Sequence, residues 1–239
     1  MLISTRGIVF RSVKYSETSF ITDIYTETKG LQHFIISGVR KAKSTTGASL
    51  FQPGSLVDIV AYYRDDKKMH RIKEARSAYP FREIPFSIHK TAVSVFISEL
   101  CSKTVQESEA NSVVFQFLWD SYVYLDSTQE SIANIPVSFM SKLATYLGFE
   151  PQIPKGEALF FDLREGVFCA SPQEMEWAKD GPVIPLLKSF FKTNINEAHT
   201  IACQRSERSE ILNTLTKYYS FHIQGFKKLN TPDIYGAIF

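Results

Sequence analysis

The spacing of apolar residues changes near Pro80, and this change constrains the fold more than any other feature of the chain. Before it, apolar and polar residues alternate in short runs rich in β-branched and aromatic residues, which is typical of strands. After it, apolar residues recur about every four positions, which is typical of a helix with one buried face. A first helical stripe consists of Ile88, Ala92, Phe96 and Leu100. The pattern predicts an α+β protein in which the strands precede the helices.

Five strands are predicted in the first third of the chain. They cover residues 7–13, 20–26, 31–36, 56–63 and 69–78. Five short strands separated by turns favour a small closed barrel of the OB type. We therefore expect an OB-fold domain at residues 1–80.

The rest of the chain, residues 81–239, is predicted to form a helical bundle with one inserted hairpin. Ser87 stands before the first helix, where it can act as an N-cap. Residues 155–172 contain two short apolar runs around a glycine turn, which indicates a ribbon-like hairpin. The junction between the two domains is placed at residues 80–85.

Three further features bound the class of protein. No apolar stretch approaches the ~18 residues that span a bilayer, and the first residues lack the pattern of a secretion signal. The cysteines Cys101, Cys169 and Cys203 are an odd number with no CxxC pair. That usage argues against a disulfide framework and fits a reducing compartment. We therefore expect a cytoplasmic protein.

The formal net charge of +2 hides an asymmetry along the chain. Residues 1–82 contain 14 Lys and Arg against 7 Asp and Glu, a balance of +7, whereas residues 83–239 contain 13 against 18, a balance of −5. A basic surface attracts phosphate by counterion release, and an acidic surface repels it. The asymmetry favours nucleic-acid binding by the first third, although a chance distribution of solvated lysines would give the same counts.

Signatures of catalysis are scarce. The sequence has no GxxxxGK[ST], no GxGxxG after a strand, no HExxH and no GxSxG. Its five histidines are scattered, and none has a second ligand at the spacing of a metal site. We therefore expect a protein that is not an enzyme and that has no cofactor.

Basic and aromatic residues are interleaved in the first third, as in proteins that bind single-stranded nucleic acids. Cations would contact phosphates, and each base stacked on a ring contributes ~1–3 kcal/mol. Phe10, Phe20 and Phe34 are expected to fill the barrel. Tyr15, Tyr62 and Tyr63 adjoin charges and turns, so they are better candidates for stacking. The candidate nucleic-acid-binding residues are Arg11, Lys14, Tyr15, Arg40, Lys41, Lys43, Tyr63, Arg64, Lys67, Lys68 and Arg71.

Several segments are similar, in their order and spacing, to those of a known family. They are residues 6–11, 15–19, 25–31 (YTETKGL), 38–41, 50–53, 81–83, 97–100, 146–151 and 160–166. No single segment is diagnostic. Together they cover most of the chain and resemble the RecO family.

The resemblance implies an OB barrel, a helical bundle and a region that in many relatives is a four-cysteine zinc ribbon. Cys169 could match one ligand position of that ribbon, but the CxxC pairs are missing. Because a structural zinc site needs four ligands, we expect a metal-free ribbon-like hairpin. Its expected apolar residues are Phe160, Phe161, Leu163, Val167 and Phe168.

The resemblance also implies a function. RecO-like proteins bind single- and double-stranded DNA, anneal complementary strands, and help to load the RecA recombinase onto gaps coated by single-strand-binding protein. Their partners are RecR and the acidic, Phe-ending tail of single-strand-binding protein. The resemblance therefore implies a DNA repair protein that acts at the bacterial nucleoid.

An acidic tail ending in Phe needs an apolar pocket for its ring and a cation for its carboxylates. Lys90 and Lys103 flank the apolar stripe of the first predicted helix, and Lys142 lies in the third. We expect one of these lysines to border a tail-binding groove between the first and third predicted helices. The alternative is that these apolar faces pack together as core.

Two other functions remain open from the residues alone. The barrel could bind RNA in translation or decay, because stacking and phosphate contacts serve either nucleic acid. The acidic helical part could instead be a protein-interaction scaffold that touches no nucleic acid.

Overall fold

The computed structural model describes residues 1–17, 19–37 and 47–231. Contacts divide the chain into two compact units, Met1–Ser127 and Thr128–Phe239, and each is described by itself. The sequence placed the junction before the first helix, whereas the first two helices belong to the same unit as the strands. The predicted division into folding domains at residues 1–80 and 81–239 stays a prediction.

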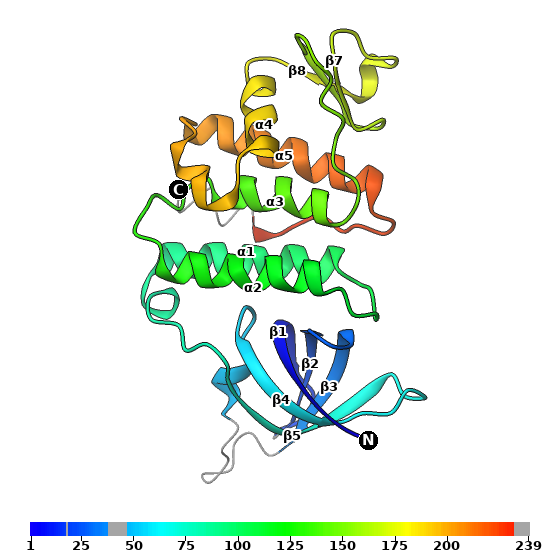
Figure 1. The fold of residues 1–239 in the computed structure, drawn as a ribbon, viewed down its shortest axis with the longest axis vertical. Coiled ribbons are helices and arrows are strands. Elements are labelled where there is room, and N and C mark those ends of the chain that lie inside the picture. The colour runs from blue at the N-terminus through cyan, green and yellow to red at the C-terminus, as the bar shows by residue number, and fades with distance from the viewer. Residues whose placement is uncertain (18, 38–46, 232–239) are drawn as a thin grey trace. The chain divides into compact units, whose positions relative to one another are not determined.

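In the first unit, the described residues include a closed barrel of five strands, which precedes the helices in the chain (Figure 1). The strands are β1 (Leu2–Lys14), β2 (Ser19–Thr26), β3 (Gly30–Ser37), β4 (Leu56–Tyr62) and β5 (Met69–Ser77). Their order around the barrel is β1-β2-β3-β5-β4, with β3 and β5 parallel and the other pairs antiparallel. The predicted α+β fold with an N-terminal five-stranded barrel is confirmed.

Strand β1 closes the barrel because it pairs with two neighbours. Residues 2–8 pair with β4 and residues 7–14 pair with β2, and a bulge between Val9 and Arg11 bends the strand. Gly7 takes part in both pairings, and a Cβ atom there would lie 2.5 Å from the Cγ2 atom of Ile24. A larger residue would therefore force neighbouring side chains to shift at this point.

Two helices, α1 (Ile88–Thr104) and α2 (Ser112–Ser127), follow the barrel in the first unit. Ser87 caps α1 as predicted, since its Oγ accepts a hydrogen bond from the backbone N–H of Lys90 (3.3 Å). The Arg6 guanidinium of β1 lies 4.8 Å from the centre of the Trp119 ring of α2. The N–H of Leu31 donates to the carbonyl of Glu107 (2.9 Å), in the segment between the helices. These contacts hold the helices against one side of the barrel.

The barrel interior is filled by inward-facing side chains from every strand and from the short 3-10 turn η1 (Ala48–Phe51). Phe34 is fully buried in this cluster and Phe20 packs against it, as predicted. Phe10 differs from the prediction, because it stacks on Tyr25 with ring centres 5.6 Å apart. Tyr25 in turn contacts Phe115 of α2, so Phe10 packs between the barrel and the helices.

A buried carboxylate fixes the segment that joins the barrel to α1, which includes the turn η2 (Ile84–Phe86). The Oδ1 atom of Asp126 accepts hydrogen bonds from the backbone N–H groups of Arg82 (3.1 Å), Glu83 (2.9 Å) and Ile84 (2.9 Å). The Nζ of Lys90 donates to the Asp126 carbonyl (2.9 Å) and to the Glu83 carboxylate (2.6 Å). Burial raises the pKa of Asp126, but the backbone donors outweigh this effect and the net pKa is lowered.

Among its described residues, the second unit combines three helices with a three-stranded sheet. The helices are α3 (Ile135–Tyr146), α4 (Val183–Lys192) and α5 (Arg205–His222), with 3-10 turns η3 (Met175–Trp177) and η4 (Ile195–Thr200). In the sheet, β6 (Phe160–Asp162) lies between β7 (Val167–Cys169) and β8 (Ala178–Asp180). The predicted hairpin is β6 and β7, whereas β8 was not predicted.

Aromatic packing stabilises this small sheet. The rings of Phe161 and Phe168 stack with centres 4.5 Å apart, and Tyr218 of α5 lies 5.0 Å from Phe161. The Oδ1 atom of Asp162 accepts hydrogen bonds from two backbone N–H groups of the β6–β7 turn, each at 3.0 Å. Among the residues that the structure describes, no group of three or more His, Cys, Asp or Glu side chains could hold a metal ion.

We predict that Asp126→Ala lowers the free energy of unfolding by roughly 3–5 kcal/mol, because three backbone N–H groups lose the buried carboxylate that accepts from them. Since folding lowers the pKa of Asp126, its contribution is present above the ordinary value of 3.8 and is lost as pH falls through the folded value. Urea unfolding at pH 7 and pH 3 should therefore show a smaller difference between parent and variant at pH 3. Asp120→Ala, on the exposed side of α2, is the control. An equal difference at both pH values would contradict this role.

We predict that chelators leave the thermal midpoint of the purified protein unchanged and that it contains less than one zinc per chain. The reason is that Phe161 and Phe168 supply the packing that four thiolates supply in a zinc ribbon. Elemental analysis and thermal unfolding with and without EDTA measure both quantities. One tightly bound zinc per chain would show that this explanation of the sheet is wrong.

Candidate nucleic-acid interface

One row of aligned residues crosses the outer surface of all five strands. Strand register pairs Val13 with Ile21, Ile21 with Ile35, Ile35 with Arg71, Arg71 with Tyr62 and Tyr62 with Leu2. We call these six residues the outer row. The adjacent positions Phe34, Ile36 and Ile72 are buried in the core. Because side chains alternate along a strand, the outer row faces away from the core.

A second row of residues lies beside the outer row and faces the same way. Register pairs Arg11 with Asp23, Asp23 with His33 and His33 with Met69. The Nδ1 atom of His33 and the Oδ1 atom of Asp23 are 2.6 Å apart, so the Asp23 carboxylate is paired with His33. Arg11 is exposed, with no ion pair among the described residues. The two rows therefore place apolar residues and the cations Arg11 and Arg71 on the outside of the barrel.

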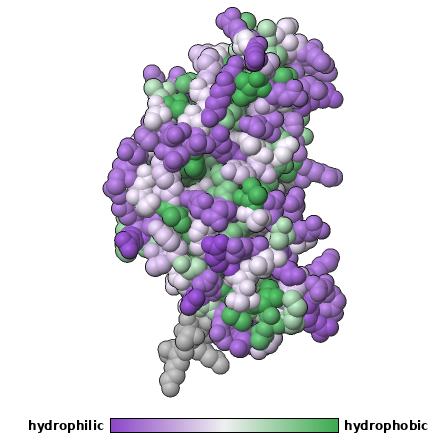
Figure 2. Space-filling model, viewed as in Figure 1, coloured by the Kyte–Doolittle hydropathy of each residue, from purple (hydrophilic) through white to green (hydrophobic). Residues whose placement is uncertain are grey.

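Exposed cations also lie at the ends of the strands. Lys14 and Tyr15 are exposed at the end of β1. Lys67 and Lys68 are exposed in the β4–β5 turn. Arg64, in the same turn, forms a bidentate pair with Asp66 at 2.9 and 3.0 Å. Both partners of that pair are largely exposed, so the pair contributes little to stability and can exchange for a phosphate at small cost. On the viewed side of the barrel, Figure 2 shows hydrophobic residues lying next to hydrophilic ones.

The structure exposes Tyr62 and buries Tyr63, although the sequence made both rings candidates for stacking and placed Tyr63 among the binding residues. Tyr62 is 51% exposed, whereas Tyr63 is 9% exposed and belongs to the barrel core. The Tyr63 ring stacks on His70 with centres 4.4 Å apart, and Lys29 Nζ lies 4.9 Å from the ring centre. Neighbouring side chains in a strand point to opposite faces, so only one of the two rings can stack on a base. The pairing of Tyr62 with Arg71 and Leu2 shows which ring faces outward, and the sequence alone does not contain this information.

His70 completes the packing beneath Tyr63. Its Nε2 lies 3.2 Å from Oε1 of Gln32, whose Nε2 donates to the carbonyl of Lys29 (2.7 Å). Burial lowers the pKa of His70, with a smaller opposing effect from Asp65. The His70 ring therefore packs against the core rings Phe34 and Tyr63. The predicted residues Arg40, Lys41 and Lys43 lie outside the described residues.

The three lysines expected to bind a partner's tail already have hydrogen-bond or ion-pair partners within the protein. Lys90 contacts Glu83 and the Asp126 carbonyl, and Lys103 pairs with Glu99 at 2.6 Å. Lys142 donates to the carbonyl of Phe191 (2.7 Å), and burial lowers its pKa. Lys90 and Lys103 belong to the first unit and Lys142 to the second. Their role in binding a partner stays a prediction.

Comparisons with known proteins cover the whole chain. The family model described as "Recombination protein O N terminal" matches residues 1–81, and "Recombination protein O C terminal" matches residues 85–231. The chain is 32% identical to "DNA repair protein RecO" of Christiangramia forsetii and 31% identical to that of Bacteroides fragilis, over the full length of both partners in each case. The protein of that name from Flavobacterium johnsoniae is 29% identical, again over full lengths. No described helix has the length and apolar character needed to cross a membrane.

We predict that Tyr63→Ala lowers the free energy of unfolding by roughly 3–5 kcal/mol, as truncation of a buried aromatic ring does. Tyr62→Ala should change it by less than about 0.5 kcal/mol, because an exposed ring leaves no cavity. Urea unfolding of both variants measures the difference. Equal losses of stability would contradict the assigned orientation of the two rings.

Proposed function

Because this chain belongs to the RecO family of DNA repair and recombination proteins, we propose that it is a DNA-binding recombination mediator. It binds single- and double-stranded DNA, anneals complementary strands, and helps to load RecA onto gaps coated by single-strand-binding protein. The observation that carries the proposal is the outer surface of the barrel, where exposed cations and an exposed ring lie beside apolar residues.

Each kind of side chain on this surface has a part in holding a single strand. Arg11 and Arg71 contact phosphates and release counterions. Tyr62 offers a face on which a base stacks, and Leu2, its pairing partner on β1, extends the apolar surface beside it. Such contacts do not depend on base identity, so the same surface accepts any sequence.

Annealing needs contacts that are numerous and individually weak. The cations reduce repulsion between two phosphate backbones, and weak contacts let the paired product leave. The balance of +7 over residues 1–82 supports this mechanism, and Arg40, Lys41 and Lys43 contribute to it. The proposal requires no bond to be made or broken by the protein.

The proposed partners are RecR and the acidic tail of single-strand-binding protein, and they rest on membership of the family. For the tail we retain Lys90, Lys103 and Lys142 as candidate cations. To bind the tail, each lysine would have to give up its present ion-pair or hydrogen-bond partner for a carboxylate of the tail. Charge reversal of each lysine singly, followed by measurement of tail-peptide and oligonucleotide binding, distinguishes them.

We predict that Arg11→Glu and Arg71→Glu each weaken binding of single-stranded DNA and reduce the slope of log affinity against log salt by ~0.7. Fluorescence anisotropy of a labelled oligonucleotide over a range of salt concentrations measures the slope. Lys155→Glu, an exposed position in the second unit, makes the same charge change and should leave the slope unaltered.

The same experiment tests the alternatives. Slopes equal to the parent's in both arginine variants would place the DNA elsewhere. Tighter binding to a matched RNA oligonucleotide would favour an RNA-binding function. No salt-dependent binding to either would favour a scaffold.

A further inference from the structure

An acid lies among the cations and apolar residues on the outside of the barrel. Asp23 of β2 pairs in register with Arg11 of β1 on one side and with His33 of β3 on the other. It is the only acid in the outer row and the row beside it. Because a carboxylate repels phosphate, an acid at this position weakens DNA binding unless its charge is balanced.

The strands that carry Asp23 and His33 are the ones with which OB barrels bind oligonucleotides. That face is formed by the second and third strands, and the β1–β2 and β4–β5 loops complete it. In this barrel, Tyr15 in the first loop and Lys67 and Lys68 in the second are exposed. The acid and the histidine therefore occupy the part of the fold where contact with a nucleic acid is expected.

The contact between the two side chains shows which nitrogen of the His33 ring carries hydrogen. The Nδ1 atom of His33 lies 2.6 Å from the Oδ1 atom of Asp23. An ionised carboxylate can only accept, so Nδ1 donates and Nε2 of the neutral ring is left as an acceptor. Nε2 has no hydrogen-bond partner among the described residues, and the side chain is 49% exposed. Nε2 is therefore open to a proton from solvent.

A phosphate group cannot hydrogen-bond to the neutral ring, because phosphate oxygens and Nε2 are both acceptors. Once Nε2 takes up a proton, it becomes a donor to a phosphate oxygen and the ring becomes a cation. Asp23 stabilises this cation through Nδ1, as the aspartate of a catalytic triad stabilises its imidazolium. The net charge of the pair then changes from one negative charge to none, so the acid no longer repels the strand.

The charges around His33 act in both directions. They are Asp23 on β2, Arg11 on β1, His70 and Arg71 on β5, and Lys68 before β5. Asp23 favours a proton on His33, whereas the cations disfavour it. Burial lowers the pKa of His70, with a smaller contribution from His33, which favours the neutral form of His70. A phosphate held by the two arginines adds negative charge beside His33 and favours its protonated form.

We propose that binding of single-stranded DNA to the first unit takes up a proton, which Nε2 of His33 holds and Asp23 stabilises. The strand is therefore held more tightly as the pH falls from about 8 to about 6, within the range where histidine gains its charge. This inference rests on the proposed function. It adds a means of adjusting how firmly a strand is held, and annealing requires that strands be released.

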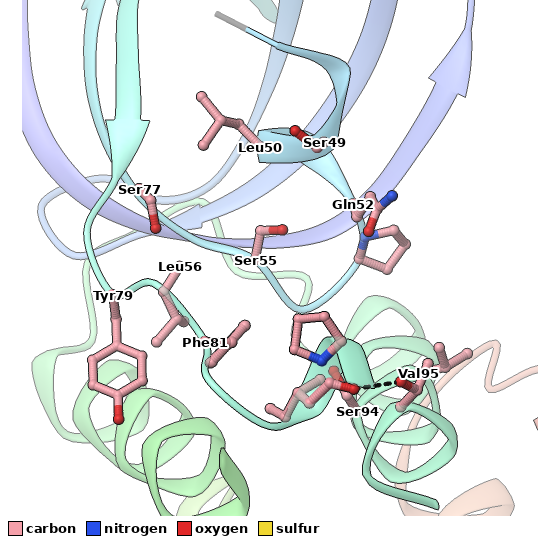
Figure 3. A pocket seen from close by; sticks show the side chains of 14 residues that line it. Ser49, Leu50, Gln52, Ser55, Leu56, Ser77, Tyr79, Phe81, Ser94 and Val95 are labelled. Atoms are coloured by element: carbon pink, nitrogen blue, oxygen red, sulfur yellow. Dashed lines mark hydrogen bonds between the residues drawn. The ribbon is translucent and has the colours of Figure 1, made fainter. Parts of the chain in front are cut away.

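A strand bound in the hollow between the barrel and α1 would not show this response. The hollow has a volume of about 590 Å³ (Figure 3). The described residues that line it carry hydroxyl, amide, aliphatic and aromatic groups, and none of these gains charge between about pH 6 and pH 8. The dependence of binding on pH therefore distinguishes this hollow from the surface that carries Asp23 and His33.

The first test measures proton uptake by isothermal titration calorimetry of the full chain with an oligonucleotide of thymidines, whose bases do not titrate near neutral pH. Titrations at pH 7 in buffers of different ionisation enthalpy give the number of protons taken up. The parent should take up a fraction of one proton per strand, and His33→Gln close to none. His89→Gln makes the same change at an exposed histidine of α1 and should match the parent. Equal uptake in the parent and His33→Gln would overturn the proposal.

The second test measures affinity and its salt dependence at pH 6 and pH 8 by fluorescence anisotropy. The parent should bind about fivefold more tightly at pH 6, as expected for one exposed ion pair gained. Its slope of log affinity against log salt should be steeper there by up to ~0.7. In His33→Gln both differences should disappear, and the affinity should stay close to that of the parent at pH 8.

Asp23→Asn tests the acid separately. It should bind more tightly than the parent at pH 8, because a negative charge is lost, and it should lose most of the pH dependence, because the carboxylate no longer stabilises the imidazolium. If the pair served only to hold β2 and β3 together, both variants would instead bind more weakly at both pH values. Circular dichroism of each variant at both pH values shows whether it is folded.

These measurements distinguish failure of the inference from failure of the proposed function. Salt-dependent binding of equal strength at pH 6 and pH 8 would overturn proton uptake and leave DNA binding standing. Absence of binding at both pH values would refute the proposed function, and the inference with it.

Discussion

Closure of the barrel at β1 is the constraint on which the rest of the first unit depends. Because β1 pairs with both β2 and β4, the sheet has no free edge there, and the register of every strand is fixed. That register decides which residues face the core and which face outward. The outer row exists only because five separate pairings bring its six residues into line. A slip of one residue in β5 would exchange Arg71 for a core residue.

The two units use different means of satisfying buried polar groups. In the first, the carboxylate of Asp126 accepts three backbone N–H groups of the segment that follows the barrel, which attaches α2 to that segment. In the second, Asp162 caps the β6–β7 turn, and stacked rings fill the space behind it. In both, a short acidic side chain serves as a backbone acceptor. The sequence shows these acids, but their partners are distant or irregular, so the role emerges only from the fold.

Alternation and helical spacing were enough to predict the strands of the barrel, α1 with its Ser87 cap, and the β6–β7 hairpin. They were insufficient where pairing between distant strands decides the outcome. Tyr62 and Tyr63 are indistinguishable as neighbours in a sequence, and only pairing with Arg71 and Leu2 shows which one is exposed. Phe10 was assigned to the barrel interior because the sequence does not show that it stacks on Tyr25, whose ring in turn contacts Phe115 of α2. The short strand β8 is set by pairing with β6 rather than by its own residues.

The parallel pairing of β3 with β5 has a consequence for how the protein is made. Strand β5 lies between β3 and β4 in the barrel although it follows both in the chain, so the cylinder cannot close until residues 69–77 are available. Leu2 pairs with Tyr62, which is far from it in the chain. Contacts between such distant segments slow folding. During synthesis β1, β2 and β3 therefore form an open meander with unpaired edges. A nascent chain interrupted before β5 would present those edges to other chains rather than a partial binding surface.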